Sequence, residues 1–247
     1  MIERKNILSL SISVLTYKEA LDSFIDLGKK RANAYACFAN VHMLMEAHKD
    51  KTFADQVNKA SFVLADGMPI VKALDSFYHI KQDRIAGMDI FPDVLKLAAE
   101  HKLKVFFYGT TPDLLEKIVL KANKEIPSLE IAGALAPPFS SSIDDEKYIS
   151  EIQNSGANMV FVALGCPKQE KWMAKHTHNI NAILLGVGGA FPIYAGTTKR
   201  APEWMRKLSL EWLYRLMQEP GRLFKRYFVT NTRFIYLITK QKLTGSA

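Results

Sequence analysis

The chain has 247 residues, of which 48% are hydrophobic, and it carries a formal net charge of +8. This length suits one large domain or one domain with an appendage, with a sizeable core. No apolar run approaches the roughly 20 residues of a membrane-spanning helix, and no signal-peptide pattern follows the N-terminus, so we expect a cytoplasmic protein. The two cysteines, Cys37 and Cys166, form no Cys-X-X-Cys pair, which argues against structural disulfides and cysteine-based zinc sites.

Short apolar runs with the length and composition of buried strands recur along the chain. Residues 7–14 indicate one strand or a strand pair, and further strands are predicted at 35–39, 62–65, 105–108, 129–132, 160–164 and 183–185. A capping box at Thr16-Tyr17-Lys18-Glu19 opens a helix to about residue 31. Further helices are expected over residues 41–48, 89–101 and 112–124. One more begins at Pro69, another follows residue 142 and ends at 153, and another begins at 168. Strands that alternate with helices favour an α/β fold with a mostly parallel, Rossmann-like sheet flanked by helices.

The excess positive charge lies entirely at the C-terminal end. Residues 199–247 contain eleven Lys or Arg against three Glu, whereas residues 1–198 are neutral in sum. We therefore predict an α/β body of residues 1–198 and a basic helical appendage of residues 199–247. The charge indicates an anionic partner for the appendage: a membrane surface, a nucleic acid or a phosphorylated substrate.

The appendage itself has two helical patterns. One helix is expected over 203–218, ended by Pro220-Gly221, and a second over 222–243. On the second helix an apolar face lies beside a basic one; the apolar residues are Leu223, Phe224, Tyr227, Phe228, Phe234, Ile235 and Ile238, and the basic ones are Arg222, Lys225, Arg226, Arg233 and Lys240. Such an amphipathic helix suits an anionic membrane surface. A helix packed on the body with a solvated basic face explains the pattern equally well.

Two apolar runs in the second half of the body end in glycine turns. Residues 160–172 pass through Gly165 and Pro167 into a helical segment that begins with Lys168 and Gln169, and the next run ends at Gly186, Gly188 and Gly189. In a βαβ unit such turns place backbone N–H groups and a helix N-terminus where anions bind, so these residues could hold phosphates. Neither turn matches Gly-X-Gly-X-X-Gly or a Walker A loop, so ordinary βα turns remain the simpler interpretation.

Asp66 ends an apolar strand and is followed by a glycine turn. A carboxylate in that place can be rigid and partly solvated, as a general base requires, or it can cap the helix that begins at Pro69. The residues alone favour the cap.

The sequence predicts no metal site. It has no Asp-X-Asp pair and no His-Glu-X-X-His motif, and no third ligand stands beside His176 and His178. Lys, Arg and backbone N–H groups would therefore have to meet the charge of a phosphate. Cys166 has no His partner at a telling position and is left without a role.

Seven short motifs, in this order, resemble the WecG/TagA/CpsF glycosyltransferases. They comprise Asn40 after a strand, Asp66–Pro69, Arg84–Asp89, Gly165–Glu170, Gly186–Phe191, Lys199–Pro202 and Leu210–Arg215, and the resemblance as a whole runs from about residue 7 to residue 226. Any one of them is weak, but the order and spacing of all seven are highly specific.

The resemblance implies an inverting, metal-independent transfer of a sugar from a UDP-sugar to a polyprenyl-diphosphate-linked sugar. N-acetylmannosamine is the favoured sugar, the place is the inner face of the cell membrane, and the product serves cell-surface polysaccharide synthesis. No cofactor is implied, and association into a homo-oligomer is left open. Under this resemblance Asp66 becomes the general base, Asn40 helps to place the acceptor sugar, Arg84 lies near the site, and Gln169 with the glycine turns holds the donor. Basic residues of the appendage would reach the diphosphate, namely Arg215, Arg222 and either Lys225 or Arg226.

Two positions depart from the family pattern. Many members have Thr where this chain has Phe38 and Asp where it has Pro192, and the second departure leaves the identity of the donor sugar open.

Two other classes of protein fit parts of the pattern. A doubly wound, nucleotide-binding oxidoreductase would use the βα turns, but the missing Gly-X-Gly-X-X-Gly counts against it. A nucleic-acid-binding protein would use the basic appendage and bind in a salt-dependent way. Because an aromatic face lies beside the basic one, lipid is favoured and no nucleic-acid partner is predicted.

Overall fold

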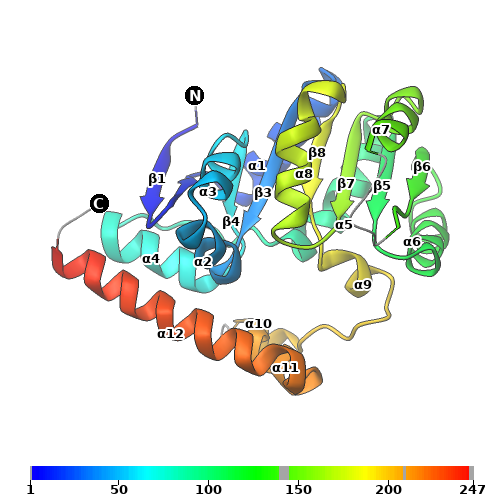
Figure 1. Cartoon of the computed structure of the whole chain (residues 1–247). Coiled ribbons are helices and arrows are strands. Elements are labelled where there is room, and N and C mark those ends of the chain that lie inside the picture. The colour runs from blue at the N-terminus through cyan, green and yellow to red at the C-terminus, as the bar shows by residue number, and fades with distance from the viewer. Residues whose placement is uncertain (1, 139–144, 208–209, 245–247) are drawn as a thin grey trace.

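The computed structural model describes residues 2–138, 145–207 and 210–244. Its main sheet has six strands in the order β4-β3-β8-β7-β5-β6, and every neighbouring pair is parallel (Figure 1). The strands are β3 (Ala34–Ala39), β4 (Phe62–Ala65), β5 (Val105–Gly109), β6 (Ile131–Leu135), β7 (Met159–Ala163) and β8 (Ile183–Gly186). The predicted α/β fold with a parallel sheet is confirmed.

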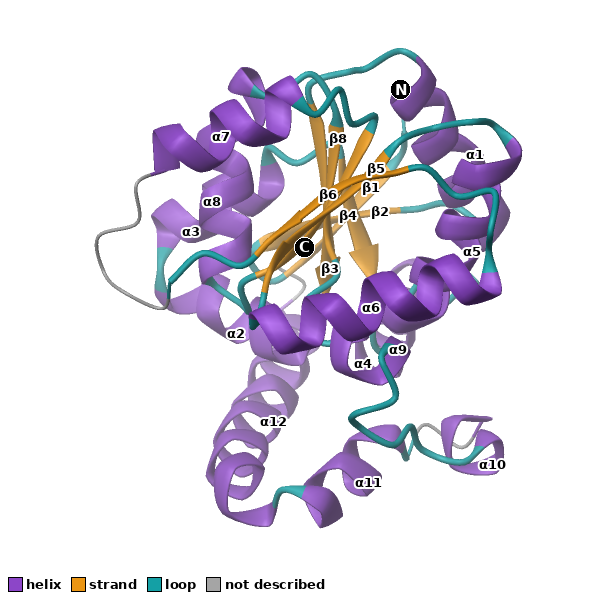
Figure 2. Cartoon of the chain, turned by 90° about the vertical axis from the view of Figure 1, so that its right-hand side faces the viewer, coloured by secondary structure: helices purple, strands orange, loops and turns teal. Residues whose placement is uncertain are grey.

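Helices cover both faces of this sheet (Figure 2). One face carries α2 (Val41–Lys49), α3 (Lys51–Asn58), α7 (Asp145–Asn154) and α8 (Lys168–His176), and the other α1 (Tyr17–Lys29), α5 (Gly87–Glu100) and α6 (Pro112–Glu125). Successive strand residues alternate between the two: Tyr35 and Cys37 pack in the core of the first layer, and Ala36 and Phe38 in that of the second. The strands are buried on both faces, which explains their continuous apolar runs.

A second, two-stranded antiparallel sheet lies beside β4. It pairs β1 (Arg4–Ile7) with β2 (Leu10–Ser13), so residues 7–14 belong to a strand pair rather than to one strand. The Ser13 hydroxyl accepts a hydrogen bond of 3.1 Å from the backbone N–H of Val63 in β4. The capping box predicted at Thr16 and Glu19 is present at the start of α1.

Asn158 ties several elements together at the amino edge of the main sheet. It precedes β7 and is buried. Its Nδ2 donates to the carbonyl of Gly28 near the end of α1 at 3.1 Å, and its Oδ1 accepts from the backbone N–H of Lys104 before β5 at 2.9 Å. Its own carbonyl accepts from Ile183 at the start of β8 at 3.2 Å. One residue therefore joins a helix and three strands, through its side chain and its backbone carbonyl.

Three predicted boundaries are wrong. The strand expected at 129–132 begins later, as β6 at Ile131, because the N–H of Leu129 is used in a turn with the carbonyl of Ile126 at 3.0 Å. The single helix expected over 203–218 is two helices, α10 (Glu203–Lys207) and α11 (Glu211–Gln218). The last helix was expected to begin at residue 222, after Pro220, but Pro220 is the first residue of α12 (Pro220–Thr244). Proline is tolerated there because the backbone N–H of the first helical residue has no partner within the helix.

Helix α12 lies along the carboxyl edge of the sheet, beside α4 (Met68–Tyr78) (Figure 1). The apolar residues that were predicted to share one side of α12 differ in burial. Phe234 is buried against the body, whereas Phe224 and Phe228 are 61% and 66% exposed. Arg233 and Lys240 are exposed, as expected of the basic face. No helix in the described ranges combines the length and apolar character that crossing a membrane requires.

Candidate active site

A cavity of about 660 Å³ opens at the carboxyl ends of four neighbouring strands, β4, β3, β8 and β7. One wall belongs to the body and includes Asn40, Asp66, Arg84, Gly165, Cys166, Gln169, Gly186, Gly188 and Gly189. The opposite wall belongs to the appendage and includes Arg206, Glu211, Trp212, Arg215, Tyr227, Thr230, Asn231, Phe234 and Ile235. The fold thus brings together most of the residues predicted from sequence, in the place where α/β proteins bind ligands.

Asp66 follows β4 directly, and its backbone N–H donates to the carbonyl of Ala39 at 2.9 Å. It does not cap the next helix: the N-cap of α4 is Gly67, without a side-chain hydrogen bond, so the cap interpretation is wrong. Burial raises the pKa of the Asp66 carboxyl to about 7, against the opposing effects of the Arg84 charge and a hydrogen bond from Asn40. The side chain is still partly exposed to the cavity, so a substrate can reach a carboxyl that exchanges its proton near neutral pH.

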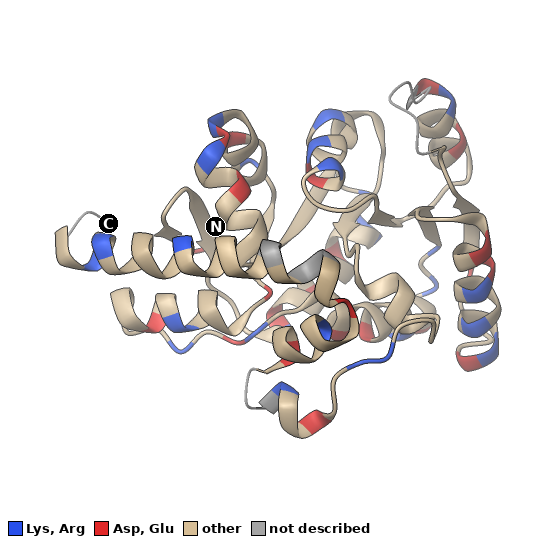
Figure 3. Cartoon of the chain, turned by 60° about the horizontal axis from the view of Figure 1, so that its bottom comes forward, with Lys and Arg blue, Asp and Glu red and all other residues tan. Residues whose placement is uncertain are grey.

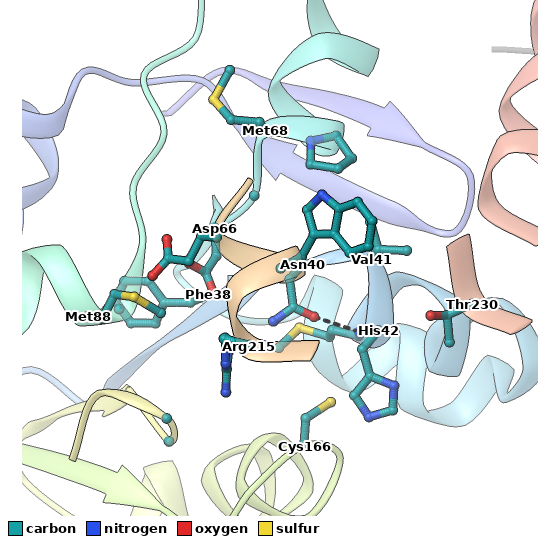
Figure 4. Close-up of a pocket in the computed structure, with 18 of the residues that line it drawn as sticks. Phe38, Asn40, Val41, His42, Asp66, Met68, Met88, Cys166, Arg215 and Thr230 are labelled. Atoms are coloured by element: carbon teal, nitrogen blue, oxygen red, sulfur yellow. Dashed lines mark hydrogen bonds between the residues drawn. The ribbon is translucent and has the colours of Figure 1, made fainter. Parts of the chain in front are cut away.

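Asn40 is placed beside Asp66 because β3 and β4 are neighbours in parallel register. It is the N-cap of α2, and its Oδ1 accepts a hydrogen bond of 3.2 Å from the backbone N–H of Met43. This contact turns the Asn40 amide nitrogen toward the cavity. Figure 4 shows Asn40, Asp66 and Arg215 around one opening, each from a different element.

Arg84 belongs to a half-buried network of charges that joins body and appendage. Its guanidinium pairs with Asp89 of α5 and, at 3.3 Å, with Glu211 of α11. Arg200 pairs with the same two carboxylates, and Arg206 lies 3.9 Å from Asp89. The network holds the appendage against the loop that carries Arg84, beside Asp66.

The glycine turns form the floor of the cavity. A side chain at Gly186 would collide with Met173, and Gly188 takes a positive φ of 37°, which favours glycine. Gln169, at the start of α8, is buried between the two turns. Lys168 differs from the other predicted donor residues: it is exposed and is not among the residues that line the cavity.

Cys166 lines the cavity, but its thiol is not set up as a nucleophile. Burial and the neighbouring Glu170 raise the pKa of the Cys166 thiol well above its ordinary value, so the thiol stays protonated and unreactive at neutral pH. This agrees with the absence of a role for it in the sequence.

Of the basic residues predicted in the appendage, Arg215 reaches the cavity. Its guanidinium lies 3.7 Å from the position that a Cβ of Gly189 would occupy, so its charge stands over the second glycine turn. Arg222, Lys225 and Arg226 belong to α12, and their side chains lie outside the part of the chain that the structure describes.

Sequence reasoning missed several lining residues of the appendage, among them Arg206, Trp212 and Tyr227. Trp212 follows Glu211 in the Leu210–Arg215 motif, and that is the signal that could have found it. The two departures from the family pattern lie in different surroundings. Phe38 is buried and lines the cavity close to Asp66 (Figure 4), whereas Pro192 lies in α9 (Ala190–Tyr194), outside the lining.

Known proteins resemble this chain over most of its length. A relative from Bacillus subtilis (strain 168), an N-acetylglucosaminyldiphosphoundecaprenol N-acetyl-beta-D-mannosaminyltransferase, is 35% identical over 210 residues, which cover 82% of this chain and 80% of the relative. Proteins of the same name from Bacillus spizizenii (strain ATCC 23059 / NRRL B-14472 / W23) and Staphylococcus aureus (strain MW2) are 33% and 29% identical; the matches cover 81% and 85% of this chain and 76% and 81% of the relatives.

The match to the family extends through the appendage. Residues 5–247 fit the sequence profile described as Glycosyl transferase WecG/TagA/CpsF family. The oxidoreductase and nucleic-acid-binding alternatives are therefore set aside. Both the cavity at the carboxyl edge and the helices that close it fall within this match, and the chain belongs to the WecG/TagA/CpsF family of glycosyl transferases.

Proposed function

We propose that this glycosyltransferase moves N-acetylmannosamine, with inversion, from a UDP-sugar to N-acetylglucosamine carried on a polyprenyl diphosphate. The observation that carries the proposal is Asp66, a carboxyl with a pKa near 7 that faces a cavity lined by Asn40, Arg84 and Arg215. The names of the relatives support the choice of both sugars and of the lipid.

The proposed reaction is a single displacement with Asp66 as general base. The Asp66 carboxylate takes the proton of an acceptor hydroxyl as that oxygen forms a bond to the anomeric carbon of the donor. The bond from that carbon to the diphosphate of UDP breaks, and UDP leaves with the additional negative charge. A base whose pKa lies near the working pH suits this proton transfer, and the Arg215 guanidinium supplies positive charge where the diphosphate departs.

The two walls of the cavity suggest where each substrate binds. We assign the donor to the glycine turns and Gln169, and the acceptor sugar to Asn40 and Asp66. Arg222, Lys225 and Arg226 are proposed to meet a diphosphate from α12. Lys168 would contact a phosphate only at the rim, because it is exposed outside the lining.

We further propose that residues 199–247 act as an appendage that binds the inner face of the membrane. Basic residues occur along α12 and acidic ones do not (Figure 3). It exposes the apolar residues Phe224, Phe228, Tyr236 and Leu243, which fits an interfacial helix at an anionic surface. Since its inner side lines the cavity, a lipid-linked acceptor in that surface would be presented to Asp66.

A transfer assay tests the reaction. The full chain is incubated with UDP-N-acetylmannosamine and a short polyprenyl-diphosphate N-acetylglucosamine, and UDP release and the disaccharide-lipid are measured. UDP-N-acetylglucosamine serves as the control donor, and the same lipid without its sugar as the control acceptor. We expect product from the first pair only. Transfer from the control donor at an equal rate would contradict the assignment of the sugar.

A further inference from the structure

The side chain of Gln169 is held by two acceptors. Its Nε2 donates to Glu170 Oε1 at 2.6 Å and to the backbone carbonyl of Gly186 at 2.9 Å. A carbonyl oxygen only accepts hydrogen bonds, so the amide nitrogen, and not the amide oxygen, must stand between these two groups. The orientation of the Gln169 amide is therefore fixed by its surroundings.

The same orientation turns the amide oxygen toward Gly188, in the floor of the cavity. Gln169 is 5% exposed, and its Oε1 is buried with no hydrogen-bond partner among the described residues. A Cβ on Gly188 would lie 2.9 Å from this oxygen, so the glycine keeps that space open. An unpaired buried acceptor on a cavity wall is costly in the free protein. A bound group that donates a hydrogen bond would satisfy it.

Glu170 is fully buried, at the start of α8. Its Oε1 accepts the hydrogen bond from Gln169, and the Cys166 thiol also lies beside the carboxyl. Burying a carboxyl is unfavourable, and the positive end of the α8 dipole offsets part of that cost. The contact with Gln169 gives this carboxyl a function in the site, although it does not line the cavity itself.

We propose that Glu170 is a positioning residue, which together with the Gly186 carbonyl fixes Gln169 so that its Oε1 accepts a hydrogen bond from a hydroxyl or acetamido N–H of the donor sugar. This inference rests on the proposed function, because it takes the cavity as the sugar site. It also specifies which part of the donor Gln169 contacts. Phosphate oxygens are acceptors and cannot donate to Gln169 Oε1, so this oxygen binds the sugar, and other groups bind the diphosphate.

The test pairs protein variants with donor analogues that each lack one hydrogen-bond donor of the sugar. Glu170→Met keeps the volume and removes the acceptor, while Gln169 Nε2 keeps its hydrogen bond to the Gly186 carbonyl. Glu170→Gln keeps an acceptor oxygen and serves as the conservative rescue. We measure kcat and KM for each donor, the Kd of UDP, and the melting temperature.

We expect one analogue to lose roughly ten- to a hundredfold in kcat/KM with the wild-type enzyme. Glu170→Met should lose a similar factor with the intact donor and less than about threefold more with that analogue, since both changes remove the same hydrogen bond. Its Kd for UDP should stay within about twofold of wild type, and Glu170→Gln should recover most of the rate.

Three results would overturn the inference: an unchanged rate in Glu170→Met, equal losses for the analogue in both proteins, or weakened binding of UDP, which would place the contact on the nucleotide. A wild-type enzyme that transfers no sugar would instead contradict the proposed function. The two failures are therefore distinguishable.

Discussion

The two walls of the cavity are built in opposite ways. On the body side, Asn40, Asp66 and the glycine turns follow buried parallel strands, so the backbone fixes their positions. On the appendage side, Arg215 and its neighbours stand on helices that half-buried ion pairs attach to the body. Much of their outer surface, including Phe224 and Phe228, is apolar and exposed.

This difference separates two tasks. A wall fixed by the core suits the chemical step, which tolerates little displacement of the reacting groups. A wall attached through ion pairs and one helix face suits contact with a membrane surface, because this wall can be altered without unfolding the sheet. Variants of each wall should therefore fail in different assays.

The largest effect is expected at the body wall. Asp66→Asn removes the proposed base, so the rate of transfer should fall by about a thousandfold, while UDP binds as before. In the wild type, kcat/KM should rise with pH up to about 7, because Asp66 acts only when ionised. Pre-steady-state transfer and calorimetric titration of UDP measure the two quantities. Normal turnover by the variant would remove Asp66 from the mechanism.

A smaller loss is expected from the appendage wall. Arg215→Ala takes away a charge that faces the second glycine turn, and kcat should fall about a hundredfold. Arg233→Ala is the matched control, since Arg233 is exposed on α12 and does not line the cavity. If the two variants had equal kinetics, the Arg215 guanidinium would have no special role in the reaction.

The outer surface of the appendage should matter for lipid and not for chemistry. Replacing both Phe224 and Phe228 by Ser removes two exposed, stacked rings. Binding to anionic vesicles should weaken at least about tenfold, with transfer to a short, water-soluble acceptor unchanged. Leu120→Ser, at an exposed apolar residue of α6, is the control in vesicle co-sedimentation. Unaltered binding by the double variant would argue against the membrane role.

The smallest effect concerns stability. The pKa of Asp66 is about 7 in the folded chain and near 3.9 when unfolded, so the contribution of this carboxyl to stability falls as the pH rises from about 4 to 7. The side chain of Asp66→Asn does not titrate, so the free energy of unfolding of the variant should rise by roughly 1 kcal/mol relative to the wild type between pH 5 and 8. Water in the cavity keeps this difference small. Urea unfolding at both pH values measures it. A difference that does not change with pH would mean that the ionised carboxylate is not penalised by folding.

The sequence predicted most of the body because its strands are buried on both sides, and continuous apolar runs mark them without knowledge of their partners. The juxtaposition of Asn40 and Asp66 follows from two successive parallel strands. The role of Asp66 did not follow from its own residues, since a cap and a base look alike until Gly67 is seen to occupy the cap position.

The appendage was predicted less well because its structure depends on contacts with distant residues. The pattern groups Phe224 with Phe234, but only the contacts of α12 with the body decide that Phe234 is buried and Phe224 is exposed. Glu211 pairs with Arg84, more than a hundred residues earlier, and no local pattern reports such a pair.

Asn158 acquires a wider meaning from its place in the fold. It joins a helix and three strands at the edge opposite the cavity, so the residues that keep the sheet together and those that line the cavity are far apart. A substitution in the cavity wall leaves these contacts untouched, and its effect on stability should add to that of a change at Asn158.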